Sequence, residues 1–204
     1  MTQIELKHGA IVLTAPSGSG KSTIARRIEQ EIPELNFSVS ATTRPPREGE
    51  IDGVHYHFLS DAAFKSSIEA GDFLEYEEVY PGRFYGTLYE GIKRIDTEGP
   101  CLLDIDVKGA MRMKEFAGDS ALILFVHPLS LEVLSNRLQL RGTESKEWLN
   151  ERLKRAEMEL TFADKCDHVI YNDVLDIAVE ETLQVVRQFL KAKQNRFERT
   201  NLPS

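Results

Sequence analysis

Nine consecutive residues near the N-terminus combine glycines, a lysine and hydroxyl side chains in a pattern that can hold phosphate groups. They are Ala15, Pro16, Ser17, Gly18, Ser19, Gly20, Lys21, Ser22 and Thr23. Backbone N–H groups of such a turn, the positive end of the following helix and the Lys21 ammonium can surround the β- and γ-phosphates of a nucleotide. The hydroxyl of Ser22 can be a ligand of Mg²⁺. The segment therefore predicts a nucleotide-binding loop, although Ala15 replaces the first glycine of the motif.

The surroundings of this loop support that interpretation. An apolar run at residues 10–13 precedes it, and Ile24, Ala25 and Ile28 follow at helical spacing. A strand, a glycine-rich turn and a helix are the context that the motif requires. The alternative, a glycine-rich loop without a chemical role, leaves this context unexplained.

Two carboxylates end a predicted apolar strand at residues 101–106. Asp104 and Asp106 lie two positions apart, so on a strand they would point to the same face. Ligands of open α/β sheets bind beyond the carboxyl ends of the strands, where these side chains could meet a metal ion and a nucleotide. The alternative is a strand that merely ends in polar residues.

Arginines and tyrosines suggest a second phosphate site. Arg44 and Arg47 flank Pro45-Pro46, which stiffens the loop, and two guanidinium groups can bind a phosphate dianion. Tyr56 and Tyr85 could donate hydroxyl groups to the same phosphate. A solvated basic loop and buried core tyrosines are the alternatives.

A third set of basic residues follows on two predicted helices. Arg137 and Arg141 share one helix face, and Arg152 and Arg155 lie on the next helix. Such side chains can close over a polyphosphate and exclude water. Ordinary surface charge is the alternative, because glutamates lie nearby.

The elements that would position these residues alternate along the chain. Strands are expected at 10–14, 37–40, 54–59, 73–79, 101–106, 121–126 and 168–171. Helices are expected after the loop to before Pro33, at 61–70, 87–97, 131–140 (ending at Gly142) and 146–163, and from 173, with a frayed tail after Lys193. This order predicts an α/β fold of the P-loop NTPase type, with a parallel core sheet covered by helices on both faces. Residues 37–90 break the rhythm and predict an inserted small antiparallel lobe.

The composition narrows the class of protein further. The chain has 204 residues, enough for one domain, and a formal net charge of −8, which argues against nucleic acid as the main partner. The sequence contains neither a secretory signal nor an apolar run of the ~20 residues that a membrane helix needs. Cys101 and Cys166 fit buried reduced thiols, and the five histidines lack metal-ligand pairing. We expect a cytoplasmic protein.

Taken together and in this order, the motifs resemble the guanylate kinase family. The similarity runs from about Ile11 to about Phe189. Its most specific stretches are Phe37 to Glu50, Phe84 to Thr87, Leu103 to Gly109 and Arg137 to Thr143. The resemblance implies Mg²⁺-dependent transfer of the ATP γ-phosphoryl group to GMP, with dGMP as a further substrate and no obligatory protein partner. It also implies a core at residues 1–36, 91–127 and 161–204, a GMP-binding lobe at 37–90 and a helical lid at 128–160.

The resemblance also implies a role for each matching residue. The GMP-binding set would be Ser40, Arg44, Arg47, Tyr56, Glu75, Tyr85, Gly86, Thr87, Asp104 and Asp106. The residues that act on the transferring phosphoryl group would be Lys21, Arg44, Arg137, Arg141 and Arg152, and Asn172 would approach the adenine. Ser22 would bind Mg²⁺, with Asp104 acting through a water molecule. Glu75 can accept the guanine N1–H and 2-amino groups, and Thr87 can donate to O6, which adenine cannot match.

Two other functions are compatible with parts of this pattern, and each disagrees with one of the motifs. Guanylate-kinase-like domains in scaffold proteins typically lose the phosphate loop, which is present here. A kinase for another phosphorylated small molecule would not need the pair Glu75 and Thr87. The segment 80–84 departs from the family pattern and is one residue longer, so the shape of that loop stays open.

Overall fold

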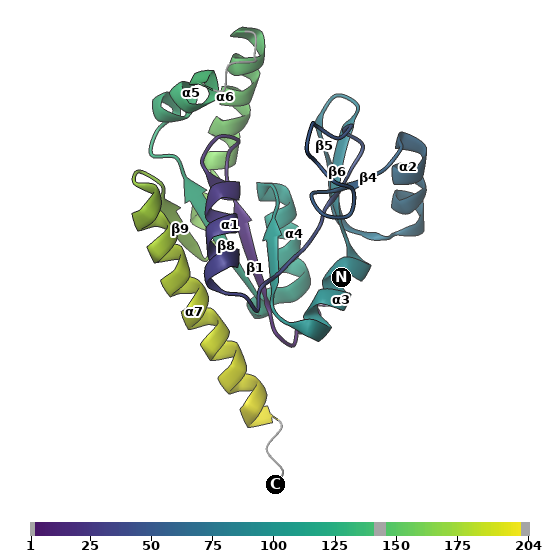
Figure 1. The fold of residues 1–204 in the computed structure, drawn as a ribbon, viewed down its shortest axis with the longest axis vertical. Coiled ribbons are helices and arrows are strands. Elements are labelled where there is room, and N and C mark those ends of the chain that lie inside the picture. The colour runs from purple at the N-terminus through teal and green to yellow at the C-terminus, as the bar shows by residue number, and fades with distance from the viewer. Residues whose placement is uncertain (1–2, 141–145, 201–204) are drawn as a thin grey trace.

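The computed structural model describes residues 3–140 and 146–200 (Figure 1). The strands are β1 (Ala10–Thr14), β2 (Asn36–Phe37), β3 (Ala41–Thr42), β4 (His57–Phe58), β5 (Phe73–Tyr80), β6 (Arg83–Leu88), β7 (Cys101–Asp104), β8 (Ala121–His127) and β9 (His168–Tyr171). The α-helices are α1 (Lys21–Glu31), α2 (Asp61–Ala70), α3 (Tyr89–Glu98), α4 (Val107–Ala117), α5 (Leu131–Leu140), α6 (Lys146–Leu160) and α7 (Leu175–Thr200). Short 3-10 helices follow α4 (Gly118–Ser120) and α6 (Ala163–Lys165).

The main sheet is parallel and has the strand order β2-β7-β1-β8-β9. Strand β1 lies at its centre, where Ala10 pairs with Cys101 on one side and with Ala121 on the other. All of β1 is buried, as expected for a strand in a parallel sheet with both faces covered. Because Leu13 pairs with Asp104, the carboxyl ends of β1 and β7 lie side by side.

Alternating side chains of β1 enter two separate hydrophobic cores. Ile11 and Leu13 pack in the core that α1 and α7 cover. Ala10 and Val12 pack on the opposite face, which α3 and α4 cover. The structure thus confirms the predicted α/β core, and Figure 1 shows α1 and α7 running along one side of the sheet.

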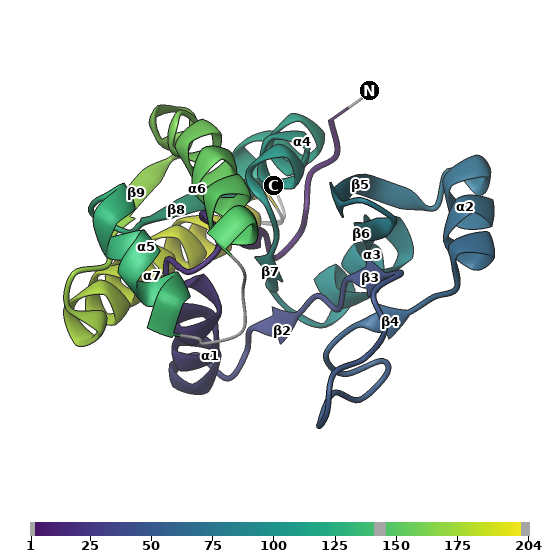
Figure 2. The same cartoon turned by 90° about the horizontal axis from the view of Figure 1, so that it is seen from above.

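A second sheet has the strand order β4-β3-β6-β5 and lies beside the main sheet with α2 (Figure 2). The pairs β3–β6 and β5–β6 are antiparallel, but β3 and β4 are parallel. The sheet is therefore mixed and not purely antiparallel as expected. Its small core includes Phe64 stacked on Phe73, with ring centroids 4.4 Å apart.

Helices α5 and α6 form a separate pair with its own apolar contact. Leu134 and Leu138, four residues apart on one face of α5, pack with Ala156 of α6. The predicted helix end at Gly142 and the predicted site residue Arg141 lie outside the described residues.

Two predicted strands prove shorter than expected. The strand predicted at 54–59 is limited to β4, because a turn occupies the residues before it: Val54 N and His55 N donate to Ile51 O at 3.2 and 3.0 Å. Of the strand predicted at 37–40, only Phe37 lies in a strand: β2 ends there, residues 38–40 cross between the two sheets outside any strand, and β3 begins at Ala41.

Other differences concern elements held by distant contacts. Strand β6 and helix α4 were not predicted, and α3 begins at Tyr89 because Thr87 and Leu88 pair with β5. Helix α6 ends at Leu160. The tail is helical to Thr200 and not frayed after Lys193, whose Nζ donates to Ser120 Oγ at 3.2 Å.

Within residues 3–140 and 146–200, no helix is both long and apolar enough to cross a membrane. Cys101 and Cys166 are free thiols. Cys101 is buried as expected, whereas Cys166 is only partly buried.

Candidate active site

The glycine-rich loop forms a tight turn between β1 and α1. Gly18 and Gly20 have φ angles of +95° and +92°, which residues other than glycine rarely adopt. Ser19 N donates to Pro16 O at 3.1 Å. Gly20 is the N-cap of α1 and has no side chain that could accept from the first helical N–H groups. The loop and the helix start thus have the geometry of a phosphate cradle.

Asn172, just after β9, supports this loop from behind. Its side-chain Nδ2 donates to Ser19 O at 2.7 Å, and its backbone O accepts from Arg137 of α5 at 2.8 Å. A Cβ atom on Gly20 would lie 2.3 Å from Nδ2 of Asn172. Glycine at position 20 therefore allows both the positive φ angle and the close approach of Asn172.

Lys21, Ser22 and Asp104 meet at the carboxyl end of β7. The ammonium group of Lys21 forms an ion pair with Asp104 and donates to Ile105 O at 3.1 Å. Ser22 Oγ donates to Asp104 Oδ2 at 2.7 Å. A hydroxyl and a carboxylate are oxygen ligands of the kind that Mg²⁺ prefers. In the described part of the chain, no group of three or more His, Cys, Asp and Glu side chains is placed to hold a metal.

Asp106 differs from the prediction in its position. Strand β7 ends at Asp104, and Asp106 is the N-cap of α4, where its Oδ1 accepts from Gly109 N at 2.8 Å. The two carboxylates are thus not on one strand face. Both nevertheless line the same cleft.

The predicted phosphate-binding arginines of the second sheet have different surroundings. Arg44 is buried, pairs with Glu50 at 2.8 Å and stacks on the ring of Tyr56, with 5.4 Å from Cζ to the ring centroid. Its hydrogen bond lowers the pKa of Glu50 to about 2. Arg47 is exposed and lines the cleft with Tyr56 and Tyr85, whose rings are 5.9 Å apart. Burial raises the pKa of Tyr56 to about 12, so its hydroxyl is protonated at neutral pH.

A buried carboxylate and hydroxyl meet across the β5–β6 hairpin. Thr87 Oγ1 donates to Glu75 Oε1 at 2.6 Å, and the side chains are 0% and 6% exposed. Burial raises the pKa of Glu75. A second oxygen of Glu75 faces Gly109, where a Cβ atom would lie 3.0 Å from Oε2. Buried acceptors of this kind need a donor from a ligand or from the protein.

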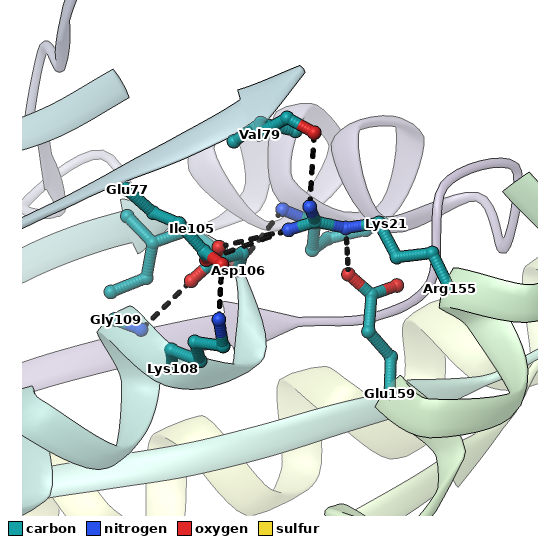
Figure 3. Close-up of polar contacts among 9 residues, drawn as sticks. All are labelled: Lys21, Glu77, Val79, Ile105, Asp106, Lys108, Gly109, Arg155 and Glu159. Atoms are coloured by element: carbon teal, nitrogen blue, oxygen red, sulfur yellow. Dashed lines mark hydrogen bonds and ion pairs between the residues drawn. The ribbon is translucent and has the colours of Figure 1, made fainter. Parts of the chain in front are cut away.

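A network of charged side chains joins this region to α6 (Figure 3). Glu77 of β5 and Asp106 are hydrogen-bonded to each other, and burial raises the pKa of Asp106 to about 7. Although burial opposes it, hydrogen bonds from Asp106 and Lys108 lower the pKa of Glu77. Arg155 of α6 donates to Asp106 Oδ2 at 3.3 Å and to Glu159 at 2.8 Å. The raised pKa of Asp106, which favours its uncharged form, and the guanidinium charge of Arg155 both reduce the repulsion between the two carboxyl groups.

These parts surround one cleft of about 320 Å³. The predicted site residues that line it are Ala15, Pro16, Ser17, Gly18, Gly20, Lys21, Ser22, Thr23, Ser40, Arg47, Tyr56, Glu75, Tyr85, Gly86, Asp104, Asp106 and Arg152. Those outside the lining are Ser19, Arg44, Thr87, Arg137 and Asn172. The structure thus brings most of the predicted residues together, and the others, within the described residues, lie directly behind the lining.

Sequence reasoning missed part of the lining. The additional residues are Glu77, Val79, Tyr80, Ile105 and Glu159; Arg155, which the sequence indicates only as part of the basic set on two helices, also lines the cleft. The spacing of some of these residues in the sequence could have indicated their position. Alternation along β5 turns Glu77 and Val79 to the same face as Glu75, and the helical spacing of α6 turns Arg155 and Glu159 to the same face as Arg152.

The parallel sheet, the cradle between β1 and α1 and the cleft that continues to a second sheet define a P-loop nucleotide-binding protein. The sequence model of the guanylate kinase family matches residues 7–193. The chain belongs to the guanylate kinase family.

Individual relatives agree with this assignment. The chain is 58% identical to the guanylate kinase of Salinibacter ruber over 182 residues, which covers 89% of this chain and 97% of that protein. It is 50% identical to the guanylate kinase of Chlorobium luteolum over 193 residues, covering 94% and 98%. The crystal structure of guanylate kinase from Anaplasma phagocytophilum is similar with a TM-score of 0.70 and 29% identity, covering 93% of this chain and 88% of that chain.

Proposed function

We propose that the chain is an enzyme that transfers the γ-phosphoryl group of ATP to GMP and so forms ADP and GDP. The observation that carries this proposal is that one cleft is lined both by the cradle and by Glu75, which Thr87 holds from behind the lining through a hydrogen bond. A donor nucleotide and an acceptor nucleotide bound in this cleft can exchange a phosphoryl group directly, without its release into solvent. Membership of the family supports the same reaction.

In this proposal the cradle holds the ATP phosphates. Backbone N–H groups of the loop and of the first turn of α1 bind the β-phosphate, and Lys21 leaves Asp104 to bind the β- and γ-phosphates. Arg152, which lines the cleft, neutralises charge on the transferring group, together with Arg137 and Arg141. Asn172 lies on the adenine side and fixes the loop through Ser19.

Mg²⁺ fits the oxygen atoms at this end of the cleft. Ser22 would bind it directly, and Asp104, 2.7 Å from that hydroxyl, would act through a water molecule. When bound, the ion neutralises charge on the β- and γ-phosphates. Before a nucleotide binds, Asp104 holds both Ser22 and Lys21, so one carboxylate positions both groups.

GMP is assigned to the second-sheet end of the cleft. The side chains that would hold its phosphate directly are Ser40, Arg47, Tyr56 and Tyr85. Arg44 packs against the ring of Tyr56 behind them and would donate to the same phosphate once the loop that carries Arg44 closes over GMP. Positioning and charge neutralisation suffice for the transfer, because the acceptor is already a phosphate oxygen.

The guanine ring is assigned to the other end of the same sheet. Glu75 would accept the N1–H and 2-amino protons, Asp106 would accept from the 2-amino group, and Thr87 would donate to O6. Gly86 keeps the strand close to β5, since a Cβ atom there would lie 2.7 Å from the Phe73 ring. A site with these buried partners selects guanine over adenine.

We propose that the chain consists of a core, a lobe (residues 37–90) and a lid (residues 128–160), and that lobe and lid close over the bound substrates before the phosphoryl group is transferred. The lobe carries the proposed GMP contacts, and the lid carries Arg137, Arg141 and Arg152. Closure of both over the substrates excludes water, which would otherwise compete as acceptor. We propose the cytoplasm as the compartment, with dGMP as a further acceptor and no obligatory protein partner.

The test is ADP formation from ATP and Mg²⁺ with GMP, dGMP, AMP, CMP or UMP offered separately. We expect turnover with GMP and dGMP and none with the others. Turnover with another base would keep the reaction type and overturn the guanine assignment. Folded protein that is inactive with all five would overturn the proposed function and favour a protein-binding module.

A further inference from the structure

One arginine outside the proposed substrate contacts joins three separate segments of the cleft. Arg155 of α6 donates to Val79 O of β5 at 3.1 Å, to Asp106 Oδ2 at the start of α4 at 3.3 Å, and to Glu159 on its own helix at 2.8 Å. It also lies 3.5 Å from Glu77 Oε2. Figure 3 shows this guanidinium group between the carboxylates and the β5 carbonyl. One planar group with five donors can satisfy acceptors on several elements at once.

The acceptors of Arg155 include a proposed guanine contact. Asp106 is held on one side by Gly109 N and on the other by Arg155. Position 109 is also adjacent to Glu75, since a Cβ atom there would lie 2.9 Å from Cδ of Glu75 and 3.3 Å from Oδ1 of Asp106. The two carboxylates assigned to guanine therefore share one wall, and Arg155 is the basic group that reaches it from the lid.

The same face of α6 carries a proposed phosphate contact. Arg152 precedes Arg155 by one turn, lines the cleft and stacks on Tyr80, with 5.8 Å between its Cζ and the ring centroid. Tyr80 also contacts Trp148, one turn earlier, with ring centroids 5.3 Å apart. The lid helix is thus placed against β5 at two points, and movement at Arg155 must move Arg152.

We propose that Arg155 is a positioning residue that couples occupancy of the guanine end of the cleft to the placement of Arg152 over the phosphates. The inference rests on the proposed function, because it assigns Asp106 to guanine and Arg152 to the phosphoryl group. Arg155 keeps Asp106 in place for GMP and anchors the lid turn that carries Arg152. Without it, Glu77 and Asp106 face each other without their shared cation, and α6 loses its hydrogen bond to Val79.

The test compares wild type with Arg155→Ala, Arg155→Lys and the control Lys154→Ala. Lys154 is an exposed cation on the same helix, so its removal should leave the kinetics unchanged. We expect Arg155→Ala to raise the KM for GMP about tenfold, the scale of losing a hydrogen bond to a charged group, and to lower kcat with the KM for ATP unchanged. Arg155→Lys should recover part of the loss, since an ammonium group reaches one acceptor but cannot bridge all of them.

A binding measurement separates positioning from a general loss of structure. Trp148 is the only tryptophan in the sequence and contacts Tyr80, so its fluorescence reports lid contact as GMP is added. Wild type and Lys154→Ala should respond at low GMP, and Arg155→Ala only at higher GMP. An unchanged or lower KM for GMP in Arg155→Ala, or equal increases for GMP and ATP, would overturn the inference.

The outcomes distinguish this inference from the proposed function. Wild type without GMP turnover defeats the proposed function. Active wild type with an equally active Arg155→Ala defeats only the role of Arg155. If Arg155→Ala does not fold, Arg155→Lys decides, because an unchanged KM for GMP in that variant is also incompatible with the bridging role.

Discussion

The proposed ATP end of the cleft takes most of its polar groups from nine consecutive residues, whereas the proposed GMP end collects its groups from β3 to α4. At the ATP end, backbone N–H groups and the start of α1 make the site, so glycine is needed at Gly18 and Gly20. At the GMP end, side chains such as Glu75 and Thr87 face each other across paired strands. The first end recognises phosphate, which all nucleotides share, and the second can recognise a base.

This difference predicts unequal effects of substitution at the two ends. Changes at the ATP end should lower turnover with every acceptor. Changes at the guanine readers should alter the use of GMP and leave the affinity for ATP intact. The three variants below test this contrast.

The largest effect is expected for Lys21→Ala. Its ammonium group lies at the cradle beside Asp104 and would meet the charge that develops on the γ-phosphoryl group. We expect kcat to fall about 10³-fold, as for removal of one preorganised donor. The measurement is the initial rate of ADP formation at saturating GMP.

The control for this variant is Arg27→Ala on the same helix. Arg27 pairs with Asp176 at 3.3 Å, but both side chains are largely exposed, so the pair contributes little. Arg27→Ala should keep wild-type kcat. Near-normal kcat in Lys21→Ala would contradict the proposed role of Lys21 and of the cradle in phosphoryl transfer.

An intermediate effect is expected for Glu75→Gln. Glutamine keeps the size of the side chain and can still accept from Thr87, but it can no longer accept two protons from guanine. We expect kcat/KM for GMP to fall on the order of 10²-fold, with unchanged ATP affinity measured by calorimetry. The matched control is Glu78→Gln, an exposed residue of the same strand. Equal losses for GMP and ATP would show that Glu75 does not read the base.

The smallest effect is expected for Gly20→Ala. The new methyl group would lie 2.3 Å from Asn172 Nδ2, so the hydrogen bond to Ser19 O must lengthen or break. ATP affinity should fall about tenfold, the scale of one hydrogen bond, with unchanged KM for GMP.

Gly49→Ala separates this contact from backbone strain. Gly49 has a φ angle of +83°, similar to that of Gly20, but nothing lies within 4 Å of the position of its Cβ atom. Gly49→Ala should lower the melting temperature slightly and leave ATP binding intact. Equal losses of ATP affinity in both variants would mean that strain, and not contact with Asn172, limits position 20.

The same contrast explains how much the sequence could predict. The cradle is local, so its residue order alone predicts its strand, turn and helix. Glu75 and Thr87 were identified through the family motifs. Asp106 was assigned to a strand because the apolar run continues to Ile105, and only the structure shows that Asp106 caps α4.

Contacts between distant segments could not be predicted in this way. Arg155 meets Val79 and Asp106 across 76 and 49 positions of sequence, and neither local spacing nor charge names those partners. The parallel pairing of β3 with β4 also depends on where the intervening loop returns. Side-chain alternation identifies the face, but the fold decides what that face meets.

The contact between Ser19 and Asn172 has a consequence for synthesis on the ribosome. The two residues are 153 positions apart, and Asn172 follows β9, the outermost strand on its side of the main sheet. A nascent chain that has released its glycine-rich loop still lacks the amide group that holds Ser19 O. The loop therefore acquires this support only after Asn172 has left the exit tunnel, so nucleotide cannot assist the folding of the earlier segments through the finished cradle.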